Sequence, residues 1–225
     1  MERTPPDRMA RQVLHKHTAK IRSEFDRKLS AGIAKACEAL DRAMSSEKKA
    51  DAVFPGIPKN EQERQAYCLA MTRKAINDIF ASLDIFRSGY FDLAQGILRS
   101  AMEGWATAVL FNVDRNIFEE FRLRKYSVNA SVGKIPKRND LGLTPDEGKR
   151  FKDIYESLHQ LVHPTMKALA TQYSFKDKEY PVGGNFDDEK IQLYTQYLKG
   201  MEIMAQNISN FLQDRFLNGR PKPNN

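Results

Sequence analysis

The chain has 225 residues, of which 41% are hydrophobic and 29% are charged, and it carries a formal net charge of +7 at pH 7. This length and apolar content predict a folded protein, either one large domain or a domain with an added helical arm. The most apolar long segment, residues 100–113, is interrupted by Glu103 and is too short to span a bilayer, so we expect neither secretion nor a membrane anchor.

The first predicted element is one long amphipathic helix over residues 8–44. Its apolar stripe recurs every three or four residues and consists of Val13, His17, Ile21, Phe25, Leu29, Ile33, Cys37, Leu40 and Met44. Such a helix has a single buried seam, which has to be covered either by the rest of its own bundle or by a second copy of the chain. Residues 45–60 contain a charged run followed by Phe-Pro-Gly-Ile-Pro, which predicts a loop.

Two helices are predicted next, over residues 61–87 and 91–112. The first ends at Ser88-Gly89, where Gly89 suits the left-handed residue that closes a helix. The second is apolar over a wide part of its circumference, which predicts a central position in the bundle.

The C-terminal half predicts three more helices. A short helix over residues 116–128 is followed by a polar loop over 133–140. The sequence Thr-Pro-Asp-Glu at residues 144–147 then predicts a helix start, with threonine as N-cap and glutamate completing a capping box, and this helix is expected to break at Pro164 before resuming. After a polar loop, Asp187 is expected to cap a final helix whose apolar stripe is Ile191, Tyr194, Leu198, Met201, Ala205, Ile208 and Leu212.

These elements predict an all-α fold, a bundle of five to six helices with a long N-terminal helix. We divide the chain into the N-terminal long helix and loop (1–60), a helical bundle (61–218) and a disordered tail (219–225). The two cysteines, Cys37 and Cys68, lack the spacing of a metal site and fit buried thiols in a reducing, cytoplasmic compartment.

Positive charge is concentrated in the middle of the chain. Residues 115–152 contain ten basic and five acidic residues, which accounts for +5 of the net charge of +7. A concentrated basic segment is typical of polyanion binders, and the alternative is a solvated helix face with a loop. The residues expected to hold a nucleic acid are Arg122, Arg124, Lys125, Lys134, Lys137, Arg138, Lys149, Arg150 and Lys152.

Two of the four histidines, His159 and His163, lie one helical turn apart just before Pro164. Because a residue before proline is pushed away from α geometry, His163 is expected at a helix break that aims its side chain at a cleft. The spacing also fits paired zinc ligands, and Glu156-x-x-His159 fits half of a di-iron site. Neither pattern is complete, because no third zinc ligand and no second Glu-x-x-His follow, so we predict no metal and no cofactor.

Arg99 and Glu103 are four residues apart on the apolar helix over residues 91–112. One interpretation is an intrahelical ion pair at an exposed edge of the helix. The other is a polar pocket in which both residues converge with His163, the arginine binding phosphate and the histidine transferring protons near neutral pH. On this interpretation the candidate catalytic residues are His163, His159, Arg99 and Glu103.

An apolar helix containing Leu98-Arg99-Ser100-Ala101-Met102-Glu103, followed by a later helix with Ser157 and a terminal His163-Pro164, resembles the HEPN-type helical domains, most closely their uncharacterised bacterial branch. The resemblance covers residues 64–169. It implies an α-helical bundle, frequent homodimerisation and, in many members, metal-independent RNA cleavage in toxin–antitoxin and phage-defence systems.

The chain departs from the pattern of active HEPN ribonucleases, in which four to six residues separate an arginine from the histidine that follows it. No arginine stands in that window before His163 or His159, and Lys152, at the long spacing from His159, lacks the guanidinium fork. Two function classes therefore stay open. The first is an RNA-binding or RNA-cleaving factor, and the second is a noncatalytic helical module for dimerisation or for a protein partner.

Overall fold

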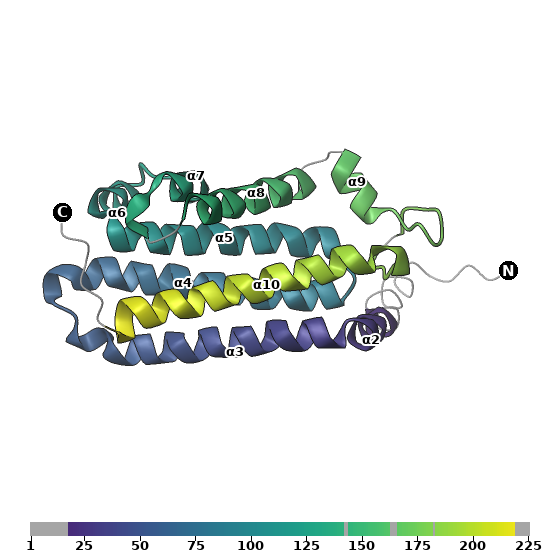
Figure 1. The fold of residues 1–225 in the computed structure, drawn as a ribbon, viewed down its shortest axis with the longest axis horizontal. Coiled ribbons are helices and arrows are strands. Elements are labelled where there is room, and N and C mark those ends of the chain that lie inside the picture. Colours follow the sequence, from purple (N-terminus) through teal and green to yellow (C-terminus); the bar gives the residue numbers. More distant parts are fainter. Residues whose placement is uncertain (1–17, 142–143, 163–165, 182, 219–225) are drawn as a thin grey trace, which may run out of the picture.

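The computed structural model describes residues 18–141, 144–162, 166–181 and 183–218. Apart from an isolated β-bridge between Ser174 and Glu179, the regular structure in these residues is helical, which confirms the predicted all-α class. The described residues contain nine α-helices (Figure 1), more than the five to six predicted. None of these helices is both long and apolar enough to cross a membrane.

Six of the nine helices have eleven residues or more, and the three short ones lie between α5 and α10. They are α2 (Thr18–Lys28), α3 (Ser30–Val53), α4 (Lys59–Arg87), α5 (Phe91–Val113), α6 (Arg115–Arg122), α7 (Ala130–Lys134), α8 (Pro145–Val162), α9 (Met166–Gln172) and α10 (Ile191–Leu212). Shorter turns link them: η2 (Phe54–Gly56), η3 (Ile135–Lys137), η4 (Asn139–Leu141), η5 (Asp188–Lys190) and the π-helical η6 (Gln213–Leu217).

The helices form a bundle with an added layer. Helices α3, α4, α5 and α10 pack together, and α6, α7, α8 and α9 lie along α5 on the side away from α3 (Figure 1). Helix α5 is therefore covered on two sides, as its wide apolar circumference predicts, and most of its residues from Gly104 to Phe111 are buried. The layer over α5 contains the basic segment and α8, the helix that carries His159.

The prediction of one N-terminal helix ending near residue 44 is wrong at both its middle and its end. Leu29 leaves helical geometry (φ −121°, ψ 19°), which separates α2 from α3, and α3 continues to Val53 through the segment predicted as a loop. The break changes the buried face of the helix, because Cys37 and Met44 are exposed whereas the small side chains Ala36, Ala39, Ala43, Ser46 and Ala50 are buried.

The seam of α3 is covered by the chain's own helices. Helix α10 packs along it, and the hydroxyls of Ser46 and Ser209 form a buried hydrogen bond of 2.9 Å between the two helices. Gly32 permits the close approach, since a Cβ there would lie 3.0 Å from Cδ1 of Leu198. The predicted stripe of α10 is confirmed, with Ile191 partly buried and the other six residues buried. A second copy of the chain is not needed to cover this seam.

The α4–α5 hairpin agrees closely with the sequence prediction. Gly89 has a φ of +86° and closes α4 as expected. Around the hairpin, aromatic rings from four elements pack edge to face, with Phe86 4.7 Å from Phe25 and Phe91 5.3 Å from Tyr194. At the opposite end of the hairpin, the buried guanidinium of Arg64 donates to the last carbonyls of α5, at 2.8 Å from Phe111 O and Asn112 O.

The predictions for residues 116–140 are partly wrong. Helix α6 ends at Arg122 rather than near residue 128, and the predicted polar loop contains α7, η3 and η4 instead. Val132 and Ile135 of this segment are buried, which explains why it folds back onto α5 and α8.

The helix starts predicted after residue 140 are confirmed. Helix α8 begins at Pro145, and the Asp187 carboxylate accepts from the backbone N–H of Glu189 at the start of η5 and α10. Helix α9 is the predicted resumption after Pro164. The break at residues 163–165, the tail and the side chain of Glu147 lie outside the described residues.

Candidate functional site

The predicted pair of Arg99 and Glu103 is present, and it is joined by a third residue. Arg99 Nε donates to Glu103 Oε1 at 3.1 Å, and the hydroxyl of Tyr155 on α8 donates to the same oxygen at 2.6 Å. The Arg99 guanidinium also lies over the Tyr155 ring, 5.3 Å from its centre. The side chains of Arg99 and Glu103 are 20% and 18% exposed, so the pair lies at the α5–α8 interface rather than at an exposed edge.

The surroundings of Tyr155 and Arg99 shift the pKa values of both groups. Burial, followed by the hydrogen bond to Glu103, raises the pKa of Tyr155, so its hydroxyl stays a donor at neutral pH. Burial acts against the charge of Arg99, but the interactions with Tyr155 and Glu103 outweigh it and raise the pKa of the guanidinium. The cluster therefore contains a permanent cation whose Nε donates to Glu103, and this guanidinium forms no ion pair with any other described residue.

His159 extends the cluster along α8. Its ring is exposed and stacks on the Tyr155 ring, with 6.2 Å between the ring centres and 24° between the planes. A guanidinium, a carboxylate, a phenol and an imidazole thus follow one another across the α5–α8 interface, which is a set able to contact a phosphate and to move a proton. His163, the predicted fourth member, lies outside the described residues, so its convergence with Arg99 stays a prediction.

The nine basic residues predicted to hold a nucleic acid lie on the layer formed by α6, α7, η3 and α8. Three have carboxylate partners: Arg122 with Glu119, Arg138 with Asp114 and Asp140, and Lys152 with Glu156. Lys134 lies over the Tyr126 ring, at 4.6 Å from its centre. The other five are exposed and form no ion pair with another described residue: Arg124, Lys125, Lys137, Lys149 and Arg150.

Two parts of this basic layer are brought together by close packing. Gly148 in the first turn of α8 lies against Pro136 of η3, where a Cβ would be only 3.0 Å from the proline Cα. Gly148 is followed in the sequence by Lys149 and Arg150, and Pro136 is followed by Lys137. The contact between Gly148 and Pro136 therefore brings the backbone of these three cations close together. Arg138 donates hydrogen bonds to the Asp140 and Asp114 carboxylates, and these bonds raise the pKa of Arg138 despite its burial. Arg138 therefore links η4 to the start of α6.

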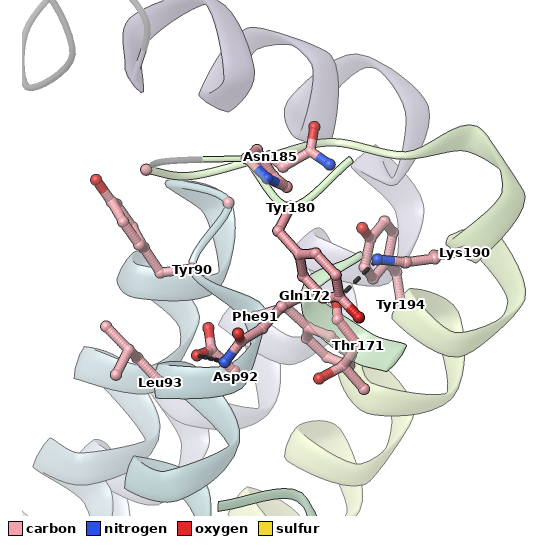
Figure 2. A pocket seen from close by; sticks show the side chains of 13 residues that line it. Tyr90, Phe91, Asp92, Leu93, Thr171, Gln172, Tyr180, Asn185, Lys190 and Tyr194 are labelled. Carbon is pink, nitrogen blue, oxygen red and sulfur yellow. Dashed lines mark hydrogen bonds between the residues drawn. The ribbon is translucent and has the colours of Figure 1, made fainter. Parts of the chain in front are cut away.

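A cavity of about 240 Å³ lies at the other end of the layer (Figure 2). Its wall comes from the start of α5, the end of α9, the loop over residues 180–185 and the first turn of α10. Aromatic side chains form much of the wall, and they are Tyr90, Phe91, Tyr180 and Tyr194. No sequence pattern predicts this cavity, because the residues that line it are spread over four segments that only the fold brings together.

Lys190 lines this cavity and is only 6% exposed. Its ammonium donates to the backbone carbonyls of Thr171, at 2.8 Å, and of Tyr173. Burial lowers the pKa of Lys190, and the charge of Asp187 opposes that shift. The two carbonyls use two of the three ammonium donors, and they tie the end of α9 to the start of α10.

Two further polar side chains of the cavity wall are Asp92, which accepts a hydrogen bond, and Asn185, whose amide nitrogen has no hydrogen-bond partner among the described residues. The Asp92 carboxylate on α5 accepts from the Gln172 amide on α9 through Oδ2, at 3.0 Å. Asn185 Nδ2 is buried and has no hydrogen-bond partner in the described structure. An unpaired buried donor costs about 1–3 kcal/mol, which an acceptor on a ligand would recover.

Sequence reasoning found the charged pair on α5 but not its partner. No motif in the sequence marks Tyr155 as a site residue, although its spacing of four from His159 places both rings on one face of a helix. No group of three or more potential metal ligands lies together in the described part of the chain.

Comparisons with known proteins supply no further constraint on the site. The chain matched no protein-family model, no curated protein and no solved structure. The HEPN resemblance accordingly stays a prediction from the sequence, and the function has to be argued from the geometry.

Proposed function

We propose that the chain is an RNA-binding protein that holds the phosphate backbone on the basic layer formed by α6, α7, η3 and α8. The observation that carries this proposal is the set of five exposed basic residues on that layer that form no ion pair with another described residue. Cations that a protein has already paired contribute little to binding, whereas unpaired ones release counterions when they meet phosphates. RNA-acting factors of bacterial defence and toxin systems are the class to which the HEPN resemblance points.

RNA cleavage is the further step that the Arg99 cluster would perform. Metal-independent cleavage needs a base for the attacking 2′-hydroxyl, an acid for the leaving 5′-oxygen and a cation for the phosphate. Arg99 is suited to the phosphate contact, and His159 and His163 are suited to the proton transfers. Glu103 is bonded to both Arg99 and Tyr155, so we assign it the positioning of these two residues.

The binding proposal is tested by the salt dependence of affinity for a single-stranded RNA, measured by fluorescence anisotropy. The variant Lys149→Ala/Arg150→Ala removes two adjacent exposed cations from α8. Each phosphate contact that is lost reduces the slope of log affinity against log salt by about 0.7 on single strands, so the slope is expected to fall by roughly 1.4.

The matched control is Lys48→Ala/Lys49→Ala, which removes two adjacent exposed cations from α3, on the opposite side of the bundle (Figure 1). Its slope is expected to equal that of the unchanged protein. The basic layer is rejected as the binding surface if both double variants weaken binding equally, or if affinity does not depend on salt.

Cleavage is tested separately by incubating RNA with the protein, with and without a chelator, alongside His163→Ala and His159→Ala. Cleavage that survives the chelator and disappears in a histidine variant would establish a metal-independent ribonuclease. Salt-dependent binding without cleavage would indicate a noncatalytic RNA-binding module. The absence of both binding and cleavage would favour the alternative function, a helical module for dimerisation or for a protein partner.

A further inference from the structure

The cavity at the α9 end lies apart from both the Arg99 cluster and the unpaired cations of the basic layer. It is built from α5, α9, α10 and the loop between the last two, and Figure 2 places side chains of both polarities around it. None of the residues that line the cavity belongs to the proposed RNA-binding surface, so the cavity is a separate candidate site.

The charges in the wall exclude a compact ion as the ligand. Asp92 supplies a carboxylate on one side and Lys190 supplies an ammonium on the other. A small cation would approach the ammonium, and a small anion would approach the carboxylate, so neither gains from the site as a whole. The wall favours a neutral group that donates hydrogen bonds at one edge and accepts them at another.

The aromatic side chains favour a flat ligand. Tyr180 is 57% exposed, yet its ring is held at the cavity by the Tyr173 ring, with 5.2 Å between the centres and 67° between the planes. Tyr90 and Pro181 lie in the same wall. Exposed, positioned tyrosine rings are the platforms on which unpaired bases stack in proteins that bind single strands.

The hydrogen-bonding groups select among flat, neutral ligands. Asp92 Oδ1 accepts no described hydrogen bond, Asn185 Nδ2 donates none, and the Lys190 ammonium has one donor beyond the two used by carbonyls. Guanine carries two parallel donors, N1–H and N2–H, which match a carboxylate, and two adjacent acceptors, O6 and N7, which match an amide and an ammonium. Cytosine and adenine lack the pair of parallel donors at one edge.

We propose that this cavity binds a guanine base, with its ring stacked on Tyr180, its donor edge on Asp92 and its acceptor edge facing Asn185 and Lys190. The base belongs either to a free guanine nucleotide or to a single-stranded RNA. The proposal does not rest on the RNA-binding function, because a free nucleotide would occupy the same cavity without contacting the basic layer.

The test is calorimetric titration of the full chain with GMP, guanosine, AMP and CMP. GMP and guanosine are expected to bind with similar affinity, because the cavity contacts the base, and CMP is expected not to bind. Tyr180→Ala, which removes the stacking ring, and Asp92→Asn, which turns one acceptor oxygen into a donor, are each expected to weaken GMP binding roughly tenfold or more.

Two matched variants control for general effects of the substitutions. Phe80→Ala removes an exposed ring of α4 that does not line the cavity, and Asp84→Asn neutralises an exposed carboxylate in the last turn of α4. Both are expected to bind GMP as the unchanged protein does, and circular dichroism checks that every variant is folded.

Binding of a uracil-rich strand with and without one guanine distinguishes the two sources of the base. Tighter binding of the guanine-containing strand, with competition by GMP, assigns the cavity to RNA, whereas GMP binding without this preference assigns it to a free nucleotide. Absence of GMP binding, equal affinity for CMP, or unchanged affinity in both Tyr180→Ala and Asp92→Asn overturns the proposal. The Lys149→Ala/Arg150→Ala variant should bind GMP normally, so failure of the basic layer and failure of the cavity give different results.

Discussion

Tyr155 joins the charged pair on α5 to α8, and it does so through a single hydroxyl. That hydroxyl donates to Glu103 at 2.6 Å and lies 3.3 Å from Arg99 Nε. Hydrogen bonds to ionised groups are stronger than neutral ones, and the partial burial of the pair limits competition from water. The hydroxyl is therefore a contributor to stability whether or not the cluster has a catalytic role.

Tyr155→Phe is expected to lower the free energy of unfolding by about 1–2 kcal/mol, because Glu103 loses its shortest donor. Urea denaturation followed by circular dichroism measures the change. The control is Tyr126→Phe, which removes a neutral hydrogen bond of 3.0 Å to Ser131 and is expected to cost less. Equal losses in the two variants would contradict a charge-assisted bond at Tyr155.

The same variant also gives a pH signature. Because the pKa of Tyr155 is raised in the folded protein, its contribution is fully present below the unfolded value near 10 and is lost as the pH rises through the folded value. The stability difference between the unchanged protein and Tyr155→Phe is expected to shrink above pH 10.

At the scale of elements, the turn between α4 and α5 is fixed by one backbone conformation and one neighbouring loop. Gly89 has a φ of +86°, and its carbonyl accepts from the backbone N–H of Asn185 at 3.0 Å. A Cβ on Gly89 would lie 2.6 Å from Asn185 N and 2.8 Å from Ile21 Cγ2. The turn thus has no room for a side chain, and it connects α2, the hairpin and the wall of the cavity.

Gly89→Ala is expected to destabilise the protein by about 1–2 kcal/mol from the left-handed conformation alone, with the steric contacts adding to that loss. Gly200→Ala is the control, because a Cβ at this position in α10 meets no atom within 4 Å. Replacing an uncrowded helical glycine is expected to raise stability by about 0.5–1 kcal/mol. Thermal denaturation of both variants checks the opposite signs.

The elements that the sequence predicted well are those with local signals. Gly89, Pro145 and Asp187 mark helix ends through backbone conformation or capping, and these boundaries are confirmed. The break at Leu29 and the burial of Val132 and Ile135 depend on packing against other helices, so no local pattern predicts them. Charged residues within residues 48–51 suggested the end of a helix that instead continues to Val53.

The candidate site divides in the same way. The contact between Arg99 and Glu103 follows from their spacing on one helix and was predictable. Tyr155 and the cavity residues come from different helices, so their proximity requires the tertiary fold. Likewise, only the fold shows that Arg122, Arg138 and Lys152 are paired with carboxylates, whereas five other basic residues of the layer form no ion pair with a described residue.

At the scale of the whole molecule, the two cysteines differ in their exposure to solvent, so their reactivity can distinguish the native from the unfolded protein. Cys37 is exposed, contrary to the prediction that both thiols are buried, whereas Cys68 is fully buried between α4 and α5, where its thiol donates to Ala108 O at 3.2 Å. Burial raises the pKa of the Cys68 thiol to about 12. The nucleophilic thiolate of Cys68 is therefore suppressed until the hairpin opens.

One thiol per chain is expected to react rapidly with DTNB under native conditions, and the second only as the protein unfolds. The slow rate should increase with urea in parallel with global unfolding, because Cys68 lies in the core. Cys37→Ser should remove the fast phase and Cys68→Ser the slow one. Rapid reaction of both thiols would show that the α4–α5 interface opens locally.

The packing of α10 on α3 has a consequence for how the protein is made. The hydroxyls of Ser46 and Ser209 meet although 163 positions separate them in the sequence. A ribosome releases α3 long before α10 is synthesised, whereas the neighbouring helices of the α4–α5 hairpin can pair during elongation. The alanine face of α3 therefore has no partner on the nascent chain until α10 has been synthesised, and the bundle closes only after that point.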